Sequence, residues 1–303
     1  MKNILILGGN GFLGFNLQKH LLSENNKITV LSRSKNLYFE ELEKVNYIYD
    51  ELKNWKLVDF QLSEFDIIIH SIGSANPFED NLNPTNILND SLFYTVEILD
   101  NLINTKVHFI YISSGGAIYG NNSSNISENS TLSPINLYGH NKKIFESYIE
   151  YYSRNYDLKC SIIRPGNVYG PGQNFKKSQG IIAHSIYKSL NNQKIKVWGD
   201  GSFVRDYIFI DDLSYFLIAL VNSSKNGIYN VGTGQGQSVI EILSIIESEV
   251  KTACKKSFVD IPFNNVNKII LDVTKAKREL NWVPLIDIRN GIRLTCDWIK
   301  SIT

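Results

Sequence analysis

A tyrosine and a lysine stand four residues apart in the stretch "YGHNK", as Tyr138 and Lys142. On a helix, this spacing puts both side chains on one face. An ammonium close to a phenol stabilises the phenolate and lowers the pKa of the phenol from about 10 towards neutral pH. The pair therefore has the chemistry of a proton donor and acceptor for a sugar hydroxyl or a ketone.

Four glycines fall within the stretch "GGNGFLG", between an apolar run and a helical pattern. Two registers fit a turn that binds a dinucleotide: Gly8, Gly11 and Gly14, or Gly9, Gly11 and Gly14. In both, the first glycine turns the chain, Gly11 leaves room for a pyrophosphate over the helix N-terminus, and Gly14 allows helix and strand to pack closely. We expect a bound cofactor here; a tight turn without a ligand is the alternative.

The residues after the second predicted strand indicate which dinucleotide is bound. In "ITVLSRSKN", Ser32 occupies the place where NAD-binding sheets carry an acid that binds the ribose hydroxyls, and Arg33 follows it. An arginine can pair with a phosphate, and Ser32 and Ser34 can donate hydrogen bonds to it. NADP is therefore favoured over NAD. The alternatives are that Arg33 is a solvated loop residue and that Asp50, in "YIYDEL", contacts the adenine side.

Short β-rich runs alternate with helical patterns in the first half of the chain, as a parallel sheet with crossover helices requires. The expected strands cover residues 3–7, 27–31, 45–49, 65–70, 107–113 and 159–164, and the clearest helices cover 11–23, 86–104 and 138–155. This α/β pattern predicts a doubly wound, Rossmann-type parallel sheet in residues 1–165. After Arg164, shorter pieces separated by turn clusters predict a smaller C-terminal region, residues 166–303, over the carboxyl ends of the strands.

Composition argues against several classes of partner. The 303 residues carry 31 lysines and arginines against 30 aspartates and glutamates, so no strong field attracts nucleic acid or an anionic membrane. No apolar run approaches the roughly 20 residues of a membrane span, and we expect a cytoplasmic protein. Three distant cysteines and five scattered histidines form no ligand pattern, so we expect no metal.

Seven motifs, taken in order, resemble the extended short-chain dehydrogenase/reductase family, in its nucleotide-sugar epimerase, dehydratase and reductase branch. They cover nearly the whole chain and are "GGNGFLG", "YISSGGAIYG", "YGHNK", "RPGNVYGPGQ", "GDGSFVRDYIFIDDL", "YNVGTGQGQS" and "LDVTKAKRELNWVP". The resemblance implies that Tyr138 is the acid/base and that Lys142 binds the nicotinamide ribose. It also implies that a serine or threonine after the fifth strand bonds the reacting oxygen.

That hydroxyl position is less clear in this chain. Counting back from Tyr119 puts it on Gly115, so Ser114 becomes the best candidate and Ser113 the reserve. Dehydratases of the family carry two acidic residues here, and "SSGGAIYG" has neither, which argues against water elimination.

The resemblance also assigns binding residues. The expected cofactor set is Gly8, Gly11, Phe12, Leu13, Gly14, Ser32, Arg33, Asp50, His70, Tyr138, Lys142 and Pro165, and the expected substrate set is Ser113, Asn167, Val197, Trp198 and Arg205. Asn167 and Arg205 would contact the nucleotide pyrophosphate, although Arg205 could instead pair with Asp206 or Asp211. A second arginine that many relatives carry is absent at Pro262, so Lys268 could supply that contact. An aspartate before "LSYFLIAL" is interpreted as a helix cap.

Three functions fit these residues. We favour an NADPH-dependent reductase of a nucleotide-linked 4-keto-6-deoxyhexose, used for surface polysaccharide precursors such as O-antigen. The alternative is a 4-epimerase of a UDP-hexose or N-acetylhexosamine with bound NAD, and a minor one is a non-catalytic NADP-binding sensor. The resemblance implies a homodimer formed through the helices at 86–104 and 138–155, and the second helix carries Tyr148, Tyr151 and Tyr152.

Overall fold

The computed structural model describes residues 1–51, 61–73, 92–121, 125–176, 180–261 and 266–303. The chain divides into two compact units. The first comprises residues 1–114, 136–164 and 217–229, and the second comprises 115–135, 165–216 and 230–303. One unit boundary, between Arg164 and Pro165, lies next to the domain boundary expected at 165/166.

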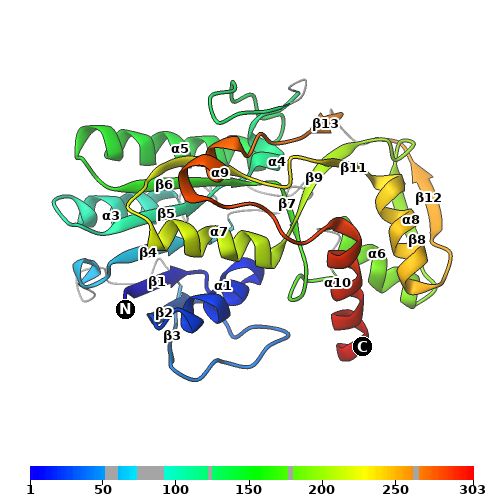
Figure 1. Ribbon diagram of the computed structural model, residues 1–303, viewed down its shortest axis with the longest axis horizontal. Coiled ribbons are helices and arrows are strands. Elements are labelled where there is room, and N and C mark those ends of the chain that lie inside the picture. The colour runs from blue at the N-terminus through cyan, green and yellow to red at the C-terminus, as the bar shows by residue number, and fades with distance from the viewer. Residues whose placement is uncertain (52–60, 74–91, 122–124, 177–179, 262–265) are drawn as a thin grey trace. The chain divides into compact units, whose positions relative to one another are not determined.

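A seven-stranded sheet forms the centre of the first unit (Figure 1). Its strand order is β10-β6-β5-β4-β1-β2-β3. The strands are β1 (Asn3–Leu7), β2 (Lys27–Ser32), β3 (Val45–Tyr49), β4 (Ile67–His70), β5 (His108–Ile112), β6 (Cys160–Pro165) and β10 (Gly227–Val231). The strands from β1 to β6 pair in parallel, and the order reverses between β1 and β4. This confirms the doubly wound sheet, in which ligands bind beside that reversal at the carboxyl ends of the strands.

Burial on both faces explains the sequence of the central strands. The strands β1, β4 and β5 read "NILIL", "IIIH" and "HFIYI", and almost every residue in them is buried, as in parallel sheets covered by helices. Among the described residues, this unit contains α1 (Phe12–Ser23), α3 (Phe93–Leu102), α5 (Leu137–Asn155) and the last residues of α7 (Ile210–Asn222), with a short 3₁₀ turn at Leu62–Glu64. The first part of the helix expected at 86–104 lies outside the described residues.

The second unit holds smaller sheets. A four-stranded sheet contains β7 (Asn167–Tyr169), β9 (Val204–Phe209), β11 (Gly236–Ser238) and β13 (Lys268–Ile269), while β8 (Lys194–Trp198) pairs with β12 (Lys255–Val259). The helices are α4 (Gly115–Ile118), α6 (Ile181–Leu190), α8 (Val239–Val250), α9 (Thr274–Leu280), α10 (Ile288–Ile302) and α7 (Ile210–Asn222), whose last residues belong to the first unit. The α6 helix packs against α8 and α10.

The interpretation of an aspartate as a helix cap before "LSYFLIAL" is wrong. The α7 helix begins at Ile210, so Asp212 lies inside its first turn. The carboxylate of Asp212 accepts hydrogen bonds from the backbone N–H groups of Leu285, at 2.9 Å, and Ile286, at 3.0 Å. A buried carboxylate needs such donors, and here they come from the segment before α10 rather than from its own helix.

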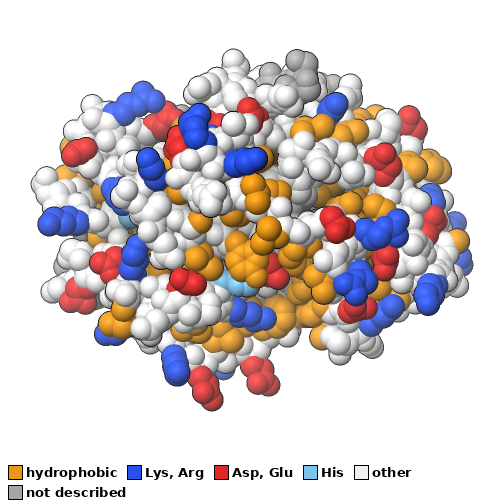
Figure 2. Space-filling view, viewed as in Figure 1, with side chains coloured by type: hydrophobic (Ala, Val, Ile, Leu, Met, Phe, Trp, Pro, Cys, Tyr) orange, Lys and Arg blue, Asp and Glu red, His pale blue; other side chains and the backbone are white. Residues whose placement is uncertain are grey.

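Acidic and basic side chains are interspersed on the face shown in Figure 2, in keeping with the balanced composition. Within the described ranges, no helix has the length and apolar character needed to cross a bilayer. The same residues contain no group of three side chains placed to hold a metal ion.

Candidate active site

The start of α5 is fixed by a side-chain cap. The Oδ1 atom of Asn136 accepts a hydrogen bond of 2.8 Å from the backbone N–H of Gly139. This cap places Tyr138 in the first turn and Lys142 one turn later. The predicted spacing of these two residues on a helix is therefore confirmed.

Lys142 is enclosed between α5 and the end of β5. Its ammonium donates a hydrogen bond of 2.8 Å to the carbonyl oxygen of Ile112. The Nζ atom lies 4.7 Å from the ring centroid of Tyr111 and 5.8 Å from that of Tyr138. Burial lowers the pKa of Lys142 to about 8, and the negative charge of Glu146 opposes that shift.

The phenol of Tyr138 is hydrogen-bonded to the hydroxyl of Ser114. Burial raises the pKa of Tyr138, and the bond to Ser114 lowers it. The sequence predicts a lowered pKa for Tyr138, whereas in this structure burial is the larger effect and the ammonium of Lys142 donates to the Ile112 carbonyl.

The two serine candidates differ in their environment. The backbone N–H of Ser113 donates to the carbonyl oxygen of Ile163 at 2.7 Å, which fixes the chain at the end of β5. The Oγ atom of Ser113 is buried and has no hydrogen-bond partner among the residues that the structure describes. Ser114, which is bonded to Tyr138, is therefore the serine that the structure joins to the tyrosine, while Gly115 opens α4.

In the glycine turn between β1 and α1, backbone conformation or close packing within the protein requires glycine at three of the four positions. Gly8 has a positive φ of 76°, so it is the residue that turns the chain. A Cβ atom on Gly9 would lie 2.7 Å from Val30, and one on Gly14 would lie 2.5 Å from the Cα of Gly9. Gly11 differs, since it is exposed and a Cβ there would meet only the Gly8 carbonyl oxygen, at 3.2 Å.

The N-terminus of α1 above this turn fits a pyrophosphate. Gly11 is the N-cap residue and makes no side-chain hydrogen bond, and the first turn contains no acidic residue. The backbone N–H groups of this turn can therefore receive an anion. Phe12 and Leu13, which open the helix, are half-buried. The residues present thus fit the dinucleotide expected from the sequence.

The ends of β2 and β3 bring Ser32 and Asp50 together. The backbone N–H of Asp50 donates to the Ser32 carbonyl oxygen at 3.1 Å. Arg33 and Ser34 are exposed just beyond β2. Asn10, which the sequence analysis did not single out, donates from its side chain to the Ser34 carbonyl oxygen at 3.0 Å. Asn10 thereby joins the glycine turn to the segment expected to select the cofactor.

His70 lies at the end of β4 but is directed inwards. Its Nε2 atom lies 3.1 Å from the Oγ1 atom of Thr95, and the imidazole is 1% exposed. Burial lowers the pKa of His70 to about 3, with a smaller contribution from the charge of Lys142. Any role of His70 towards a cofactor would therefore be exerted through its neighbours.

The expected substrate residues Asn167 and Arg205 lie on neighbouring strands of the second unit. The strand β7 pairs in parallel with β9, and Asn167 is opposite Tyr207. Trp198 is half-buried at the end of β8, whereas Val197 is buried. Pro165, the last residue of β6, is buried as well.

Arg205 and Asp206 follow one another on β9 but have different surroundings. Arg205 donates from Nη1 to the Val204 carbonyl oxygen at 2.9 Å. The carboxylate of Asp206 accepts hydrogen bonds from the N–H and hydroxyl of Thr233, at 2.8 Å and 2.7 Å, and from the backbone of Gly234 and Leu271. Asp206 therefore holds the "GTGQG" turn beside β9.

Lys268 is exposed on β13, opposite Val204 of β9, next to the position of Arg205. Pro262, where many relatives carry an arginine, lies outside the described residues.

A buried ion pair between Glu146 and Arg164 was not predicted from the sequence. One signal was available, because Glu146 follows Lys142 at the spacing that keeps both on one helix face. Its partner could not be identified in this way, since Arg164 is on another element.

Comparisons of sequence and structure show which known proteins this chain is similar to. The model of a family described as the NAD dependent epimerase/dehydratase family matches residues 4–232. The chain is 28% identical to a UDP-glucose 4-epimerase from Mycolicibacterium smegmatis, over 98% of each protein. It is also 28% identical to a dTDP-4-dehydro-6-deoxyglucose reductase from Escherichia coli, over 96% of this chain and 95% of that one. A solved structure of a Thermus thermophilus UDP-glucose 4-epimerase with NAD matches with a TM-score of 0.89 and 26% identity, covering 99% of this chain and 100% of that one.

Proposed function

Because the chain belongs to the NAD dependent epimerase/dehydratase family, we propose that this enzyme oxidises or reduces the 4-position of a nucleotide-linked sugar, with Tyr138 as the acid/base. The observation that carries the proposal is the joining of Ser114, Tyr138 and Lys142 at the carboxyl end of β5. A nicotinamide dinucleotide, when bound, supplies or takes up the hydride at the sugar carbon.

The protein's own part of the reaction is to move a proton and to hold an oxygen. In the direction of reduction, Tyr138 gives its phenolic proton to the carbonyl oxygen of the sugar as that oxygen gains negative charge. Ser114 donates a hydrogen bond to the same oxygen, and Lys142, as an ammonium, stabilises the phenolate that remains. In the direction of oxidation, the phenolate takes the proton of the sugar hydroxyl.

The cofactor would be held mainly by backbone. The N-terminus of α1 at Gly11 would receive the pyrophosphate, and Ser32, Arg33 and Ser34 would contact the adenosine ribose or its phosphate. Asp50 lies beside Ser32 and would contact the adenine side. In the second unit, Asn167 and Arg205 would bind the pyrophosphate of the sugar nucleotide, with Trp198 near the base.

The same residues could catalyse either the reduction of a 4-keto sugar or the 4-epimerisation of a sugar, and we favour reduction. The end of β2 carries Ser32 and the exposed Arg33 in place of an acid, which suits NADPH. A reductase consumes its cofactor at each turnover, and the reductase from Escherichia coli is similar over nearly the full length. The proposed substrate is therefore a nucleotide-linked 4-keto-6-deoxyhexose, and the product is a precursor for surface polysaccharide such as O-antigen.

The second candidate is a 4-epimerase that keeps NAD bound. It is supported by the full-length similarity to a UDP-glucose 4-epimerase and by the structural match to an epimerase with NAD. An epimerase uses the same acid/base, but the hydride returns to the other face of the sugar and no cofactor is consumed.

The two candidates are distinguished by incubating the purified enzyme anaerobically with NADPH and a dTDP-4-keto-6-deoxyhexose. Stoichiometric loss of absorbance at 340 nm, together with its absence in Tyr138→Phe, supports the reductase. NAD retained through purification, with interconversion of UDP-hexoses and no NADPH consumption, supports the epimerase. If neither reaction occurs, the proposed function is wrong.

We also propose that the enzyme is a homodimer and acts in the cytoplasm, where nucleotide sugars and nicotinamide cofactors are made. The α3 and α5 helices pack together and expose aromatic side chains, with Phe93 60% exposed and Tyr151 52% exposed. Exposed aromatic groups of this kind are enriched at interfaces. Light scattering should give twice the chain mass, and Tyr151→Glu should reduce it to the monomer mass.

A further inference from the structure

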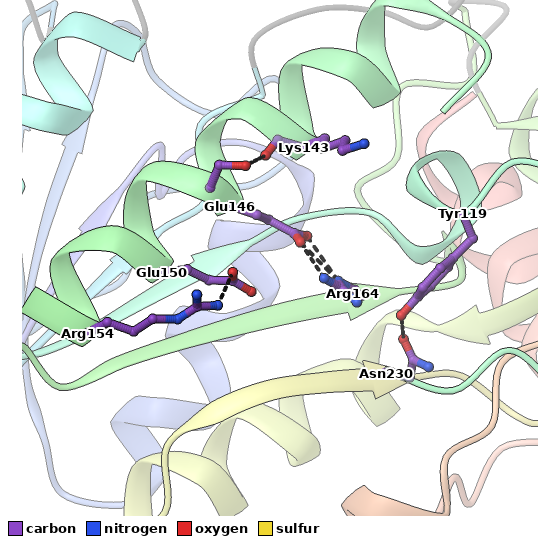
Figure 3. Close-up of polar contacts among 8 residues, drawn as sticks. Tyr119, Lys143, Glu146, Glu150, Arg154, Arg164 and Asn230 are labelled. Carbon is purple, nitrogen blue, oxygen red and sulfur yellow. Dashed lines mark hydrogen bonds and ion pairs between the residues drawn. The ribbon is translucent and has the colours of Figure 1, made fainter. Parts of the chain in front are cut away.

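The side chains of Glu146, on α5, and Arg164, on β6, are buried against one another. Arg164 comes from β6, and its Nε atom lies 3.1 Å from each carboxylate oxygen of Glu146, while Nη2 donates to Oε2 at 2.6 Å. Both side chains are 2% exposed. Figure 3 shows Glu146 reaching from the helix to Arg164 on the strand, with the two charged groups facing one another.

Stability alone is a weak reason for such a pair. Removing two charges from water is costly, and apolar residues of similar volume often fold at least as well. The same helix also carries an ordinary pair, Glu150 and Arg154, at 2.8 Å with much greater exposure of both side chains. Figure 3 shows this second pair one turn further along α5. The carboxylates of the buried pair and of the exposed pair thus lie one turn apart on the same helix, so the exposed pair can serve as a control for the buried one.

The buried pair connects the two segments that carry the candidate active site. Glu146 is one turn after Lys142 on the same face of α5. Arg164 directly follows Ile163, whose carbonyl oxygen accepts the hydrogen bond from the backbone N–H of Ser113. The pair thus ties the turn of Lys142 to the strand end beside the two serines.

The charges around Lys142 give the pair a second effect. The carboxylate of Glu146 favours the ammonium form of Lys142, which burial disfavours. The titratable and charged groups facing Lys142 are Tyr138 and Glu146 of α5, Tyr111 of β5 and His70 of β4, with Arg164 of β6 behind Glu146.

We propose that Glu146 and Arg164 are positioning residues for Lys142: together they hold its turn of α5 against the ends of β5 and β6, with a carboxylate one helical turn from the lysine. This inference rests on the proposed role of Lys142 in the reaction. Arg164 fixes the carboxylate in place, and Glu146 supplies the negative charge that the buried ammonium needs.

The test is the pH dependence of kcat in Glu146→Gln. This change keeps the shape of the side chain, removes the negative charge and leaves the positive charge of Arg164 nearby. An opposite charge close to a titratable group moves its pKa by about one unit or more, so loss of the Glu146 charge should lower the pKa of Lys142. We expect the alkaline limb of the kcat profile to move to lower pH by about that amount, with kcat reduced at pH 8.

Two further variants separate positioning from folding. The double variant Glu146→Met with Arg164→Met removes both charges, so its alkaline limb should lie between those of the wild type and Glu146→Gln. Glu150→Gln, at the exposed pair, should change neither the profile nor the melting temperature. A lower melting temperature in Glu146→Gln with an unmoved alkaline limb would mean that the pair is only structural, and the proposal would be overturned.

The protonation of Lys142 can also be measured without following the enzymatic reaction. In protein labelled with ¹⁵N at lysine Nζ, the Lys142 signal is identified by its loss in Lys142→Arg, and its titration is followed by NMR. The proposal predicts a lower titration midpoint in Glu146→Gln, whichever reaction the enzyme catalyses. An unchanged midpoint overturns the proposal even if Tyr138→Phe confirms the proposed function. If the titration midpoint of Lys142 shifts in Glu146→Gln but the wild type shows neither NADPH consumption nor interconversion of UDP-hexoses, the proposed function is wrong. The effect of the Glu146 charge on Lys142 is then still supported.

Discussion

The hydroxyl of Ser114 is hydrogen-bonded to the phenol of Tyr138 at the carboxyl end of β5. The neighbouring Ser113 is fixed through its backbone to Ile163, and its hydroxyl has no partner among the described residues. This difference decides which serine should matter more for the proton transfer. The sugar oxygen that receives the proton must lie next to the phenol of Tyr138. A hydroxyl that is hydrogen-bonded to this phenol, as that of Ser114 is, can therefore also reach the sugar oxygen.

We predict that Ser114→Ala lowers kcat by about 100-fold, as expected for the loss of one donor to a developing oxyanion. Ser113→Ala serves as the matched control and should have the smaller effect. Steady-state kinetics of both variants, with melting temperatures measured in parallel, test the assignment. A larger loss of kcat in Ser113→Ala would transfer the role to Ser113.

Replacing Gly14 with alanine should reduce stability, whereas replacing Gly11 with alanine should reduce cofactor affinity. Gly14→Ala places a Cβ 2.5 Å from the backbone of Gly9, so the chain must shift, and we predict a loss of unfolding free energy of about 1–3 kcal/mol. Gly11→Ala meets only a carbonyl oxygen at 3.2 Å and should fold normally. It should nevertheless weaken cofactor binding roughly tenfold, or about 1.4 kcal/mol, because the methyl group occupies the approach to the helix N-terminus.

Urea unfolding and fluorescence titration with NADPH measure the two effects separately. Wild-type affinity in a well-folded Gly11→Ala would show that the glycine turn receives no pyrophosphate.

The choice of cofactor should depend on Arg33. We predict that Arg33→Ala weakens NADPH binding by roughly tenfold, as expected for one charge-assisted hydrogen bond, and leaves NADH binding unchanged. Ser32→Asp should act in the opposite direction, because an acid binds the ribose hydroxyls of NAD and repels a phosphate. The dissociation constants of both cofactors test this prediction.

Lys27 at the other end of β2 provides the control, since it is also exposed. Lys27→Ala should leave both affinities unchanged. Equal affinities of wild type and Arg33→Ala for NADPH would favour NAD as the natural cofactor.

Two buried histidines should make the fold sensitive to acid. Burial lowers the pKa of His70 and of His108 to about 3, from an ordinary value near 6.5. Between these values, the unfolded chain binds protons that the native state does not. The free energy of unfolding should therefore fall as the pH drops below about 6.5, by up to roughly 1.4 kcal/mol per pH unit for each histidine.

His108 is suited to the test because it lies away from the candidate active site and bonds to Ser161 at 2.8 Å. Urea unfolding from pH 7 to pH 5 should show a shallower decline in His108→Gln than in the wild type. The exposed His140 provides the control, and His140→Gln should follow the wild type. Parallel curves for all three proteins would contradict the prediction.

Local patterns were sufficient for the sheet and for the helix face of Tyr138 and Lys142. Strands such as "NILIL" are apolar throughout because both of their faces are covered, and the helix period places residues four apart on one face. The glycine stretch predicted a turn, but two registers were equally compatible with it. The structure distinguishes them through the positive φ of Gly8.

Features that depend on distant parts of the chain could not be predicted. Asp212 resembled a helix cap, yet its hydrogen-bond donors are Leu285 and Ile286. Arg164 follows Glu146 by 18 residues and approaches it only because β6 lies under α5. The pKa of Tyr138 depends on burial, which its spacing from Lys142 does not reveal.

In the proposed reaction, a hydride reaches the 4-carbon of the sugar while Tyr138 supplies the proton. The most direct measurement uses NADPH with deuterium at the transferable position and a dTDP-4-keto-6-deoxyhexose, followed by NMR of the isolated product. We predict one deuterium at C4 of the sugar with the wild type and no labelled product with Tyr138→Phe. Deuterium at another carbon, or full labelling by Tyr138→Phe, would contradict the account.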